Sequence, residues 1–162
     1  MILLFFCIYK MLPITTNIEL DASAKKMKIK TYKGIFMRNE PLPELKLGKY
    51  IFNLDDKEKS GTHWVGLIVT TAGNNNLYFD SFGLPPPEEI KEWCKSHGDD
   101  LYYSTIPIQD EDSSSCGYFV LRWLKYIQDS KSKQLNTFSD YVHKYFTHDT
   151  TKNEKKLAEY FD

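Results

Sequence analysis

The 162-residue chain lacks a strong excess of either charge, because 21 lysines and arginines stand against 22 aspartates and glutamates, a formal net charge of -1. Without a basic excess the composition does not indicate general nucleic-acid binding, and the lysine runs near 25–28 and 152–156 are typical of solvated faces. An apolar content of 41% is that of a folded globular protein. The length is that of one ordinary domain, so we predict a single domain over residues 1–162.

Cysteine is scarce. The three cysteines, Cys7, Cys94 and Cys116, are odd in number and far apart, which argues against a disulfide framework and indicates a reducing compartment. No cysteine or histidine pair has the spacing of a zinc site, so we expect neither a metal nor another cofactor.

The sequence also lacks a hydrophobic run long enough to cross a bilayer. The first nine residues, Met1 to Tyr9, are strongly apolar, but no basic segment leads them and no small-residue cleavage site follows. We interpret them as a buried N-terminal strand and expect no membrane association. The alternative is that translation begins at Met11 and that residues 1–10 are dispensable.

Apolar spacing predicts alternating strands and helices along the rest of the chain. We expect a surface helix at 18–27, an edge strand at 29–36, buried strands at 50–54 and 61–70, a turn at 72–76, and a return strand at 77–80. A helix opened by Pro87 follows, and then a strand at 101–108 that Pro107 limits to an edge or an end. Apolar stripes at 138–146 and 157–161 predict further helices.

The chain is organised around the stretch that begins at Cys116. A serine-rich run ends there and an apolar helical pattern starts, with Phe119, Val120, Trp123, Leu124 and Ile127 at the spacing of a buried helix face. The three serines before the cysteine are good helix-capping types. Cys116 should therefore lie in the first turn, where free N–H groups and the helix dipole favour a thiolate. Taken alone, a small buried hydrophobic cysteine is the commoner interpretation.

Three residues elsewhere in the sequence favour a reactive Cys116 over a purely structural one. His63 begins the predicted central strand and Asp80 ends its return strand, so antiparallel pairing would bring both near the same end of a hairpin. Together with Cys116 they match the needs of thiol-based acyl transfer: a nucleophile, a general acid and base, and a carboxylate that orients it. Gln109 could donate its side-chain amide to the oxyanion, with the Cys116 backbone N–H as second donor. Each residue alone has a commoner structural explanation, but the four in this order are hard to explain by chance.

Four blocks carry a resemblance to known proteases. They are Gly61 to Val65 around His63, Tyr78 to Gly83 around Asp80, Ile108-Gln109, and Ser115 to Phe119 around Cys116. In this order they are similar to the adenain-type cysteine proteases, the maturation proteases of adenoviruses, of Maverick or polinton elements and of virophages. The wider clan includes the proteases of SUMO and other ubiquitin-like modifiers. The resemblance covers about residues 50–127, and residues 138–161 more loosely.

The resemblance implies an α+β fold with a central, mostly antiparallel sheet flanked by helices, and with the catalytic cysteine at the N-terminus of a buried helix. By that resemblance His63, Asp80 and Cys116 correspond to the catalytic triad, and Gln109 to the oxyanion-hole glutamine. Trp64 would line a narrow substrate cleft, which favours cleavage after Gly in Gly-Gly or Gly-x-Gly sequences. Adenain itself carries Glu at the position of Asp80, whereas Asp is common elsewhere in the clan.

The leading functional expectation is a cysteine protease, a hydrolase, that cuts viral capsid precursor polypeptides during virion maturation. It would act as a monomer in the virion and in the host-cell cytoplasm or viral factory. Adenain is activated by a capsid-derived peptide and by DNA; an activating peptide stays open for this chain, whereas the charge balance argues against DNA. The alternatives are a deSUMOylase-like or deubiquitinase-like enzyme acting on host conjugates, and a non-catalytic binding module on a decayed protease fold.

Overall fold

The computed structural model describes residues 12–40, 42–55, 63–71, 75–96, 100–131 and 134–162. The strands are β1 (Tyr32–Met37), β2 (Gly48–Asn53), β3 (Trp64–Val69), β4 (Asn76–Phe79) and β5 (Leu101–Tyr103). The helices are α1 (Asn17–Lys26), α2 (Glu88–Lys95), α3 (Cys116–Asp129), α4 (Gln134–Asp140), the π-helix η1 (Tyr141–Tyr145) and α5 (Thr150–Phe161). The expected N-terminal strand, and residues 72–74 of the expected turn, lie outside the described residues.

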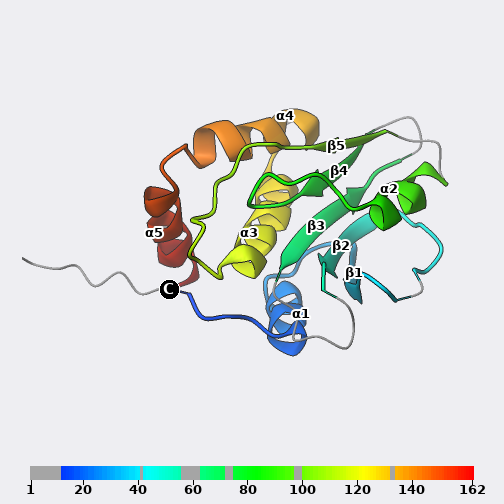
Figure 1. Cartoon of the computed structure of the whole chain (residues 1–162), viewed down its shortest axis with the longest axis horizontal. Coiled ribbons are helices and arrows are strands. Elements are labelled where there is room, and N and C mark those ends of the chain that lie inside the picture. Colours follow the sequence, from blue (N-terminus) through cyan, green and yellow to red (C-terminus); the bar gives the residue numbers. More distant parts are fainter. Residues whose placement is uncertain (1–11, 41, 56–62, 72–74, 97–99, 132–133) are drawn as a thin grey trace, which may run out of the picture.

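The five strands form one sheet in the order β1-β2-β3-β4-β5 (Figure 1). The two central pairs, β2 with β3 and β3 with β4, are antiparallel, whereas each edge strand pairs in parallel with its neighbour. The α+β fold with helices around a central sheet is therefore confirmed. The register of β1 against β2 is irregular between Tyr32 and Gly34.

The last strand is shorter than the sequence predicts. We expected a strand over 101–108, but β5 ends at Tyr103. Beyond it the Ser104 hydroxyl accepts from the backbone N–H of Ile106 at 3.1 Å, which turns the chain away from the ladder. The backbone N–H groups of Ile108 and Gln109 then both donate to the carbonyl of Ser81, at 2.9 and 3.1 Å. The segment therefore carries Gln109 to the turn that follows β4.

Both faces of the sheet are covered. Side chains alternate along a strand, so β4 directs Leu77 and Phe79 to one face and Tyr78 to the other. The first face packs against α3, with α1 and α4 beside it, and the second packs against α2 (Figure 1). This double coverage explains why every described residue of β2, β3 and β4 is buried.

Helix α3 is the central element of the first layer. All five apolar positions expected to form its buried face are buried, as are Gly117 and Leu121. The burial reaches around most of the helix because the sheet, α1, α4 and α5 surround it, and Figure 1 shows it between these elements. The sequence pattern is thus that of a core helix rather than a surface helix.

The C-terminal helices follow the predicted stripes only in part. Phe138, Tyr141, Val142 and Phe146 are buried, as their spacing indicates. In α5, however, Leu157 is buried while Tyr160 is exposed, and two polar residues, Asn153 and Glu154, are buried. The inward face of α5 is therefore partly polar, which apolar spacing alone does not predict.

Gly66 of β3 allows the sheet and α3 to approach closely. A β-carbon at this position would lie 2.8 Å from the Trp123 ring and 3.1 Å from a Val120 methyl. We predict that Gly66→Ala lowers the free energy of unfolding by about 1–3 kcal/mol through overpacking. Chemical denaturation measures this loss of stability. In a Trp123→Leu background Gly66→Ala should lower the free energy of unfolding by less, because the ring that it would contact is absent. An equal cost in both backgrounds would contradict this packing explanation.

Candidate active site

The hairpin of β3 and β4 brings His63 to Asp80. His63 directly precedes β3, Asp80 directly follows β4, and the register pairs Gly66 with Phe79. The Nε2 atom of His63 lies 2.8 Å from Oδ2 of Asp80. The carboxylate is fully buried, whereas the imidazole keeps a small exposed surface. The antiparallel pairing therefore places the two residues together at one end of the hairpin, as the sequence predicts.

The turn after β4 fixes the carboxylate and the imidazole. The second oxygen of Asp80, Oδ1, accepts from the backbone N–H of Phe82 at 2.8 Å. The Phe82 ring stacks on His63 with centroids 5.2 Å apart and planes 30° apart. Gly83 closes the turn at φ +71°, where a β-carbon would lie 2.7 Å from the Thr105 backbone, so only glycine fits without strain.

Cys116 is the first residue of α3 and is only 3% exposed. Its Sγ atom accepts from the backbone N–H of Trp64 at 3.5 Å. The next residue, Gly117, makes this approach feasible, because a β-carbon there would lie 2.7 Å from Oγ1 of Thr15 and 3.2 Å from the Trp64 ring. The N-terminus of α3 and the Trp64 N–H therefore both lie at the sulfur.

The capping of α3 differs from the expectation. Ser115 occupies the N-cap position, and its carbonyl accepts from the Phe119 N–H at 3.1 Å, but its hydroxyl makes no capping bond. The Ser113 hydroxyl instead accepts from the Ser115 N–H at 3.3 Å. The serine run thus organises the loop before the helix rather than capping the helix itself.

Burial and neighbouring polar groups shift the pKa of His63 in opposite directions. Burial disfavours the imidazolium and lowers the pKa, but the hydrogen bond to Asp80 and the interaction with Cys116 favour it and win, raising the pKa to about 9. Since Nε2 faces Asp80, Nδ1 is the ring nitrogen left for the thiol. The raised pKa of His63 therefore favours its imidazolium form at neutral pH, between Asp80 and Cys116.

Gln109 is 2% exposed and bonded at both ends of its side chain. Its Oε1 atom accepts from the Ser81 hydroxyl. Its Nε2 atom donates to the carbonyl and the hydroxyl of Ser113, at 2.9 and 3.0 Å. Gln109 thus lies in the loop that leads to Cys116, and its amide nitrogen is engaged by Ser113 in this structure.

Trp64 does not occupy the position expected of a cleft wall. Its side chain is 2% exposed and belongs to the core beneath the sheet, against the first turn of α3. In this structure its backbone N–H, rather than its ring, faces the candidate nucleophile. The ring packs inward because the strand alternation directs Trp64 and Ile68 to the α3 face.

Three residues that contact the candidate site, Ser81, Phe82 and Glu154, were not predicted from the sequence. Phe82 and Ser81 lie within the block around Asp80, and only their proximity to it could have indicated a role. Glu154 contacts the loop between Gln109 and Cys116 from α5, more than forty residues away in sequence. No sequence signal marks that contact.

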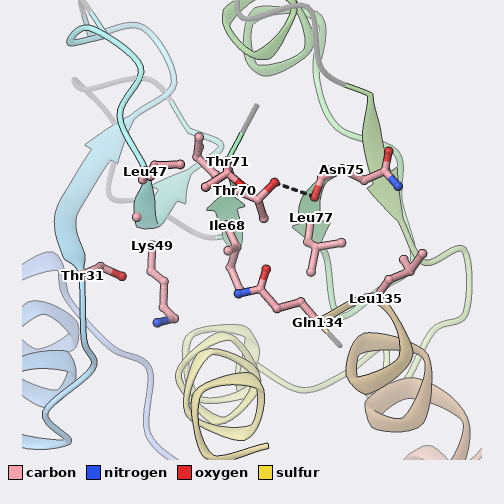
Figure 2. A pocket seen from close by; sticks show the side chains of 12 residues that line it. Thr31, Leu47, Lys49, Ile68, Thr70, Thr71, Asn75, Leu77, Gln134 and Leu135 are labelled. Atoms are coloured by element: carbon pink, nitrogen blue, oxygen red, sulfur yellow. Dashed lines mark hydrogen bonds between the residues drawn. The ribbon is translucent and has the colours of Figure 1, made fainter. Parts of the chain in front are cut away.

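Several cavities lie on the described part of the chain. One of about 650 Å³ lies at the far end of β3 and β4, between the sheet and the start of α4, and is lined by Lys49, Ile68 and Gln134 among others (Figure 2). Lys49 is satisfied there by the carbonyl of Lys30 at 2.9 Å. Among the described residues, no cluster of three or more His, Cys, Asp or Glu side chains could hold a metal ion.

Comparison with solved structures gives the same fold. Two crystal structures of the ASFV pS273R protease, one of them of its selenomethionine form, match with TM-scores of 0.60 and 0.57 at 17% and 16% identity. Both matches cover 89% of this chain, which spans about two thirds of the matched chains, at 65% and 66%. No protein-family model matches the chain. A search of curated protein sequences gives no match either.

At this level of identity the likeness establishes the fold alone. The chain shares the α+β fold of the ASFV pS273R protease. The narrower resemblance to adenain and to virophage proteases stays a prediction, as do the roles of the individual site residues.

The charge on His63 provides a direct test of the site. We predict that Asp80→Asn lowers the pKa of His63 from about 9 toward its ordinary value of 6.5, and that Cys116→Ala lowers it as well. NMR titration of the imidazole measures both. Because the folded pKa is the higher one, protonation of His63 stabilises the fold fully below about pH 6.5, and this contribution is lost as pH rises through about 9. A pKa that Asp80→Asn leaves unchanged would contradict the assigned pairing.

Proposed function

We propose that the chain is a cysteine endopeptidase that uses His63, Asp80 and Cys116 as its triad. The observation that carries the proposal is the hydrogen bond of His63 to a buried Asp80, beside a cysteine that begins α3, on a protease fold. The charge distribution suits a thiolate–imidazolium pair, since the imidazole pKa is raised and the sulfur accepts a backbone N–H.

The proposed reaction follows from these positions. The Cys116 thiolate attacks the scissile carbonyl carbon, the C–S bond forms, and the carbonyl oxygen becomes an oxyanion. As the C–N bond breaks, the His63 imidazolium gives its proton to the leaving amine. Neutral His63 then takes a proton from water as the water oxygen attacks the thioester; the C–S bond breaks, the acid is released, and the Cys116 thiolate and the His63 imidazolium are restored. Asp80 holds the ring and stabilises its charge throughout.

The oxyanion requires donors that are aimed at it. The Cys116 backbone N–H at the start of α3 is one, and the Gln109 amide is the second. In this structure Nε2 of Gln109 is bonded to Ser113, so one of its two hydrogens has to leave Ser113 when substrate binds. The proposal therefore includes a small rotation of the Gln109 amide during turnover.

We propose viral capsid precursor polypeptides as substrates, with cleavage after Gly in Gly-Gly or Gly-x-Gly sequences. The support is the residue-level resemblance to adenain-type proteases around His63, Asp80 and Cys116. Action as a monomer, in the virion and in the host-cell cytoplasm or viral factory, belongs to the same proposal, and an activating peptide is compatible with it. Among the described residues, no helix is long and apolar enough to cross a membrane.

The second candidate keeps the chemistry and changes the substrate. The fold is the one found in SUMO-protease-like enzymes, so a protease of ubiquitin-like modifiers would use the same residues. Such an enzyme needs a broad surface for a folded modifier, whereas a maturation protease needs only an extended segment.

Substitution of the four residues tests the mechanism. We predict that Cys116→Ala and His63→Ala abolish peptide cleavage, while Asp80→Asn and Gln109→Ala leave measurable activity. For Gln109→Ala the expected loss in kcat is about 10²–10³-fold, as for removal of one oxyanion donor. Steady-state kinetics on a cleaved peptide measure these values, and Cys94→Ala is the control for a buried cysteine outside the site. Full activity of Cys116→Ala would overturn the proposal.

A peptide library tests the substrate specificity. We predict enrichment of glycine at the residue before the scissile bond, and cleavage of capsid precursors co-expressed with the wild-type chain but not with Cys116→Ala. Intact mass spectrometry reads the cleavage site. A library without glycine preference would contradict the specificity, and selective cleavage of modifier fusions instead of capsid precursors would favour the second candidate.

A further inference from the structure

Glu154 is a buried carboxylate far from the triad in sequence. It lies on the inward face of α5 and is 6% exposed. One of its oxygens, Oε1, accepts both from the backbone N–H of Asp110 at 3.1 Å and from the Ser113 hydroxyl at 2.7 Å. Within the described ranges it has no ion-pair partner, and both of these hydrogen bonds come from the loop between β5 and α3.

The contact with Ser113 extends through Gln109 to Ser81. Ser113 accepts from Nε2 of Gln109, and Oε1 of Gln109 accepts from the Ser81 hydroxyl. Four buried or partly buried side chains from three parts of the chain thus form one continuous line of hydrogen bonds: Ser81, Gln109, Ser113 and Glu154.

The direction of these hydrogen bonds follows from two groups that can only accept, the Glu154 carboxylate and the Ser113 carbonyl. A carboxylate can only accept, so the Ser113 hydroxyl must donate its single hydrogen to Glu154. The Ser113 oxygen then accepts, and the group of Gln109 that faces it must be the NH₂ group. The carbonyl of Ser113, which also only accepts, requires the same orientation at 2.9 Å. The Gln109 carbonyl is left for Ser81.

A second residue of α5 ties the same loop. The Nδ2 atom of Asn153 donates to the carbonyl of Ile108 at 3.0 Å and to that of Thr147 at 2.7 Å. Adjacent residues of one helix therefore hold the backbone on both sides of Gln109, at Ile108 and at Asp110. The two tethers explain why α5 carries buried polar residues on its inward face.

We propose that Glu154 is a positioning residue for the oxyanion hole, acting through Ser113 to hold the donor end of the Gln109 amide on the side of the loop that leads to Cys116. The inference rests on the proposed protease function for its effect on rate. Glu154 does not touch the reacting atoms, so its substitution changes catalysis only by way of Gln109 and the loop.

Kinetics in two backgrounds test the coupling. Glu154→Gln keeps the shape of the side chain but replaces a charge-assisted acceptor, so we predict a fall in kcat of about tenfold with KM changed by less than about twofold. In a Gln109→Ala background the same change should have no further effect on kcat. Glu159→Gln, an exposed residue of the same helix, removes the same charge and should leave kcat unchanged. Equal losses with and without Gln109, or no loss, would overturn the proposal.

A second measurement does not depend on proteolysis. The side-chain NH₂ signals of Gln109 in the ¹⁵N-labelled chain should be protected from hydrogen exchange, lose that protection in Glu154→Gln and in Ser113→Ala, and keep it in Glu159→Gln. Ser113→Ala breaks the line of hydrogen bonds while leaving Glu154 bonded to Asp110. It therefore provides the same test if Glu154→Gln fails to fold. Unchanged Gln109 signals in both variants would overturn the positioning role. An inactive wild type with the predicted NMR changes would overturn only the protease function.

Discussion

The antiparallel register of β3 and β4 is the constraint on which the candidate site depends. With Gly66 opposite Phe79, the chain enters β3 from His63 and leaves β4 at Asp80, so the imidazole and the carboxylate meet at the same end of the hairpin. A slip of one residue would turn Asp80 to the other face of the sheet. Gly66 also lets Trp123 pack closely, so the contact that seats α3 against the sheet is made on the same strand.

The loop between β5 and α3 supplies the other half of the site. Its start is held by the carbonyl of Ser81, in the turn that also contains Asp80, and its middle is held by Glu154 of α5. It ends at Cys116, whose approach to Trp64 depends on the absence of a side chain at Gly117. Asp80, Gln109 and Cys116 are thus positioned by one connected set of hydrogen bonds and close backbone contacts.

Sequence patterns predicted the elements that have strong periodicity and failed where polar contacts decide the structure. The apolar spacing after Cys116 predicted α3, and the turn between two apolar runs predicted the hairpin. The strand at 101–108 was predicted too long because its last N–H groups bond to Ser81 rather than to a strand. Trp64 was placed in a cleft by the family resemblance, whereas its side chain is buried in the core. The lysine run at 152–156 is typical of a solvated face, yet Glu154 within it is buried.

Alkylation of the cysteines at neutral pH tests the central claim most directly, because the account requires a thiolate at Cys116 that His63 maintains. The chain would be treated briefly with iodoacetamide, and peptide mass spectrometry would quantify modification at Cys116 and at the buried Cys94, in the wild type and in His63→Ala. The account predicts rapid modification of Cys116, slow modification of Cys94, and a large loss of Cys116 reactivity in His63→Ala. A Cys116 that is no more reactive than Cys94, or that reacts equally without His63, would contradict it.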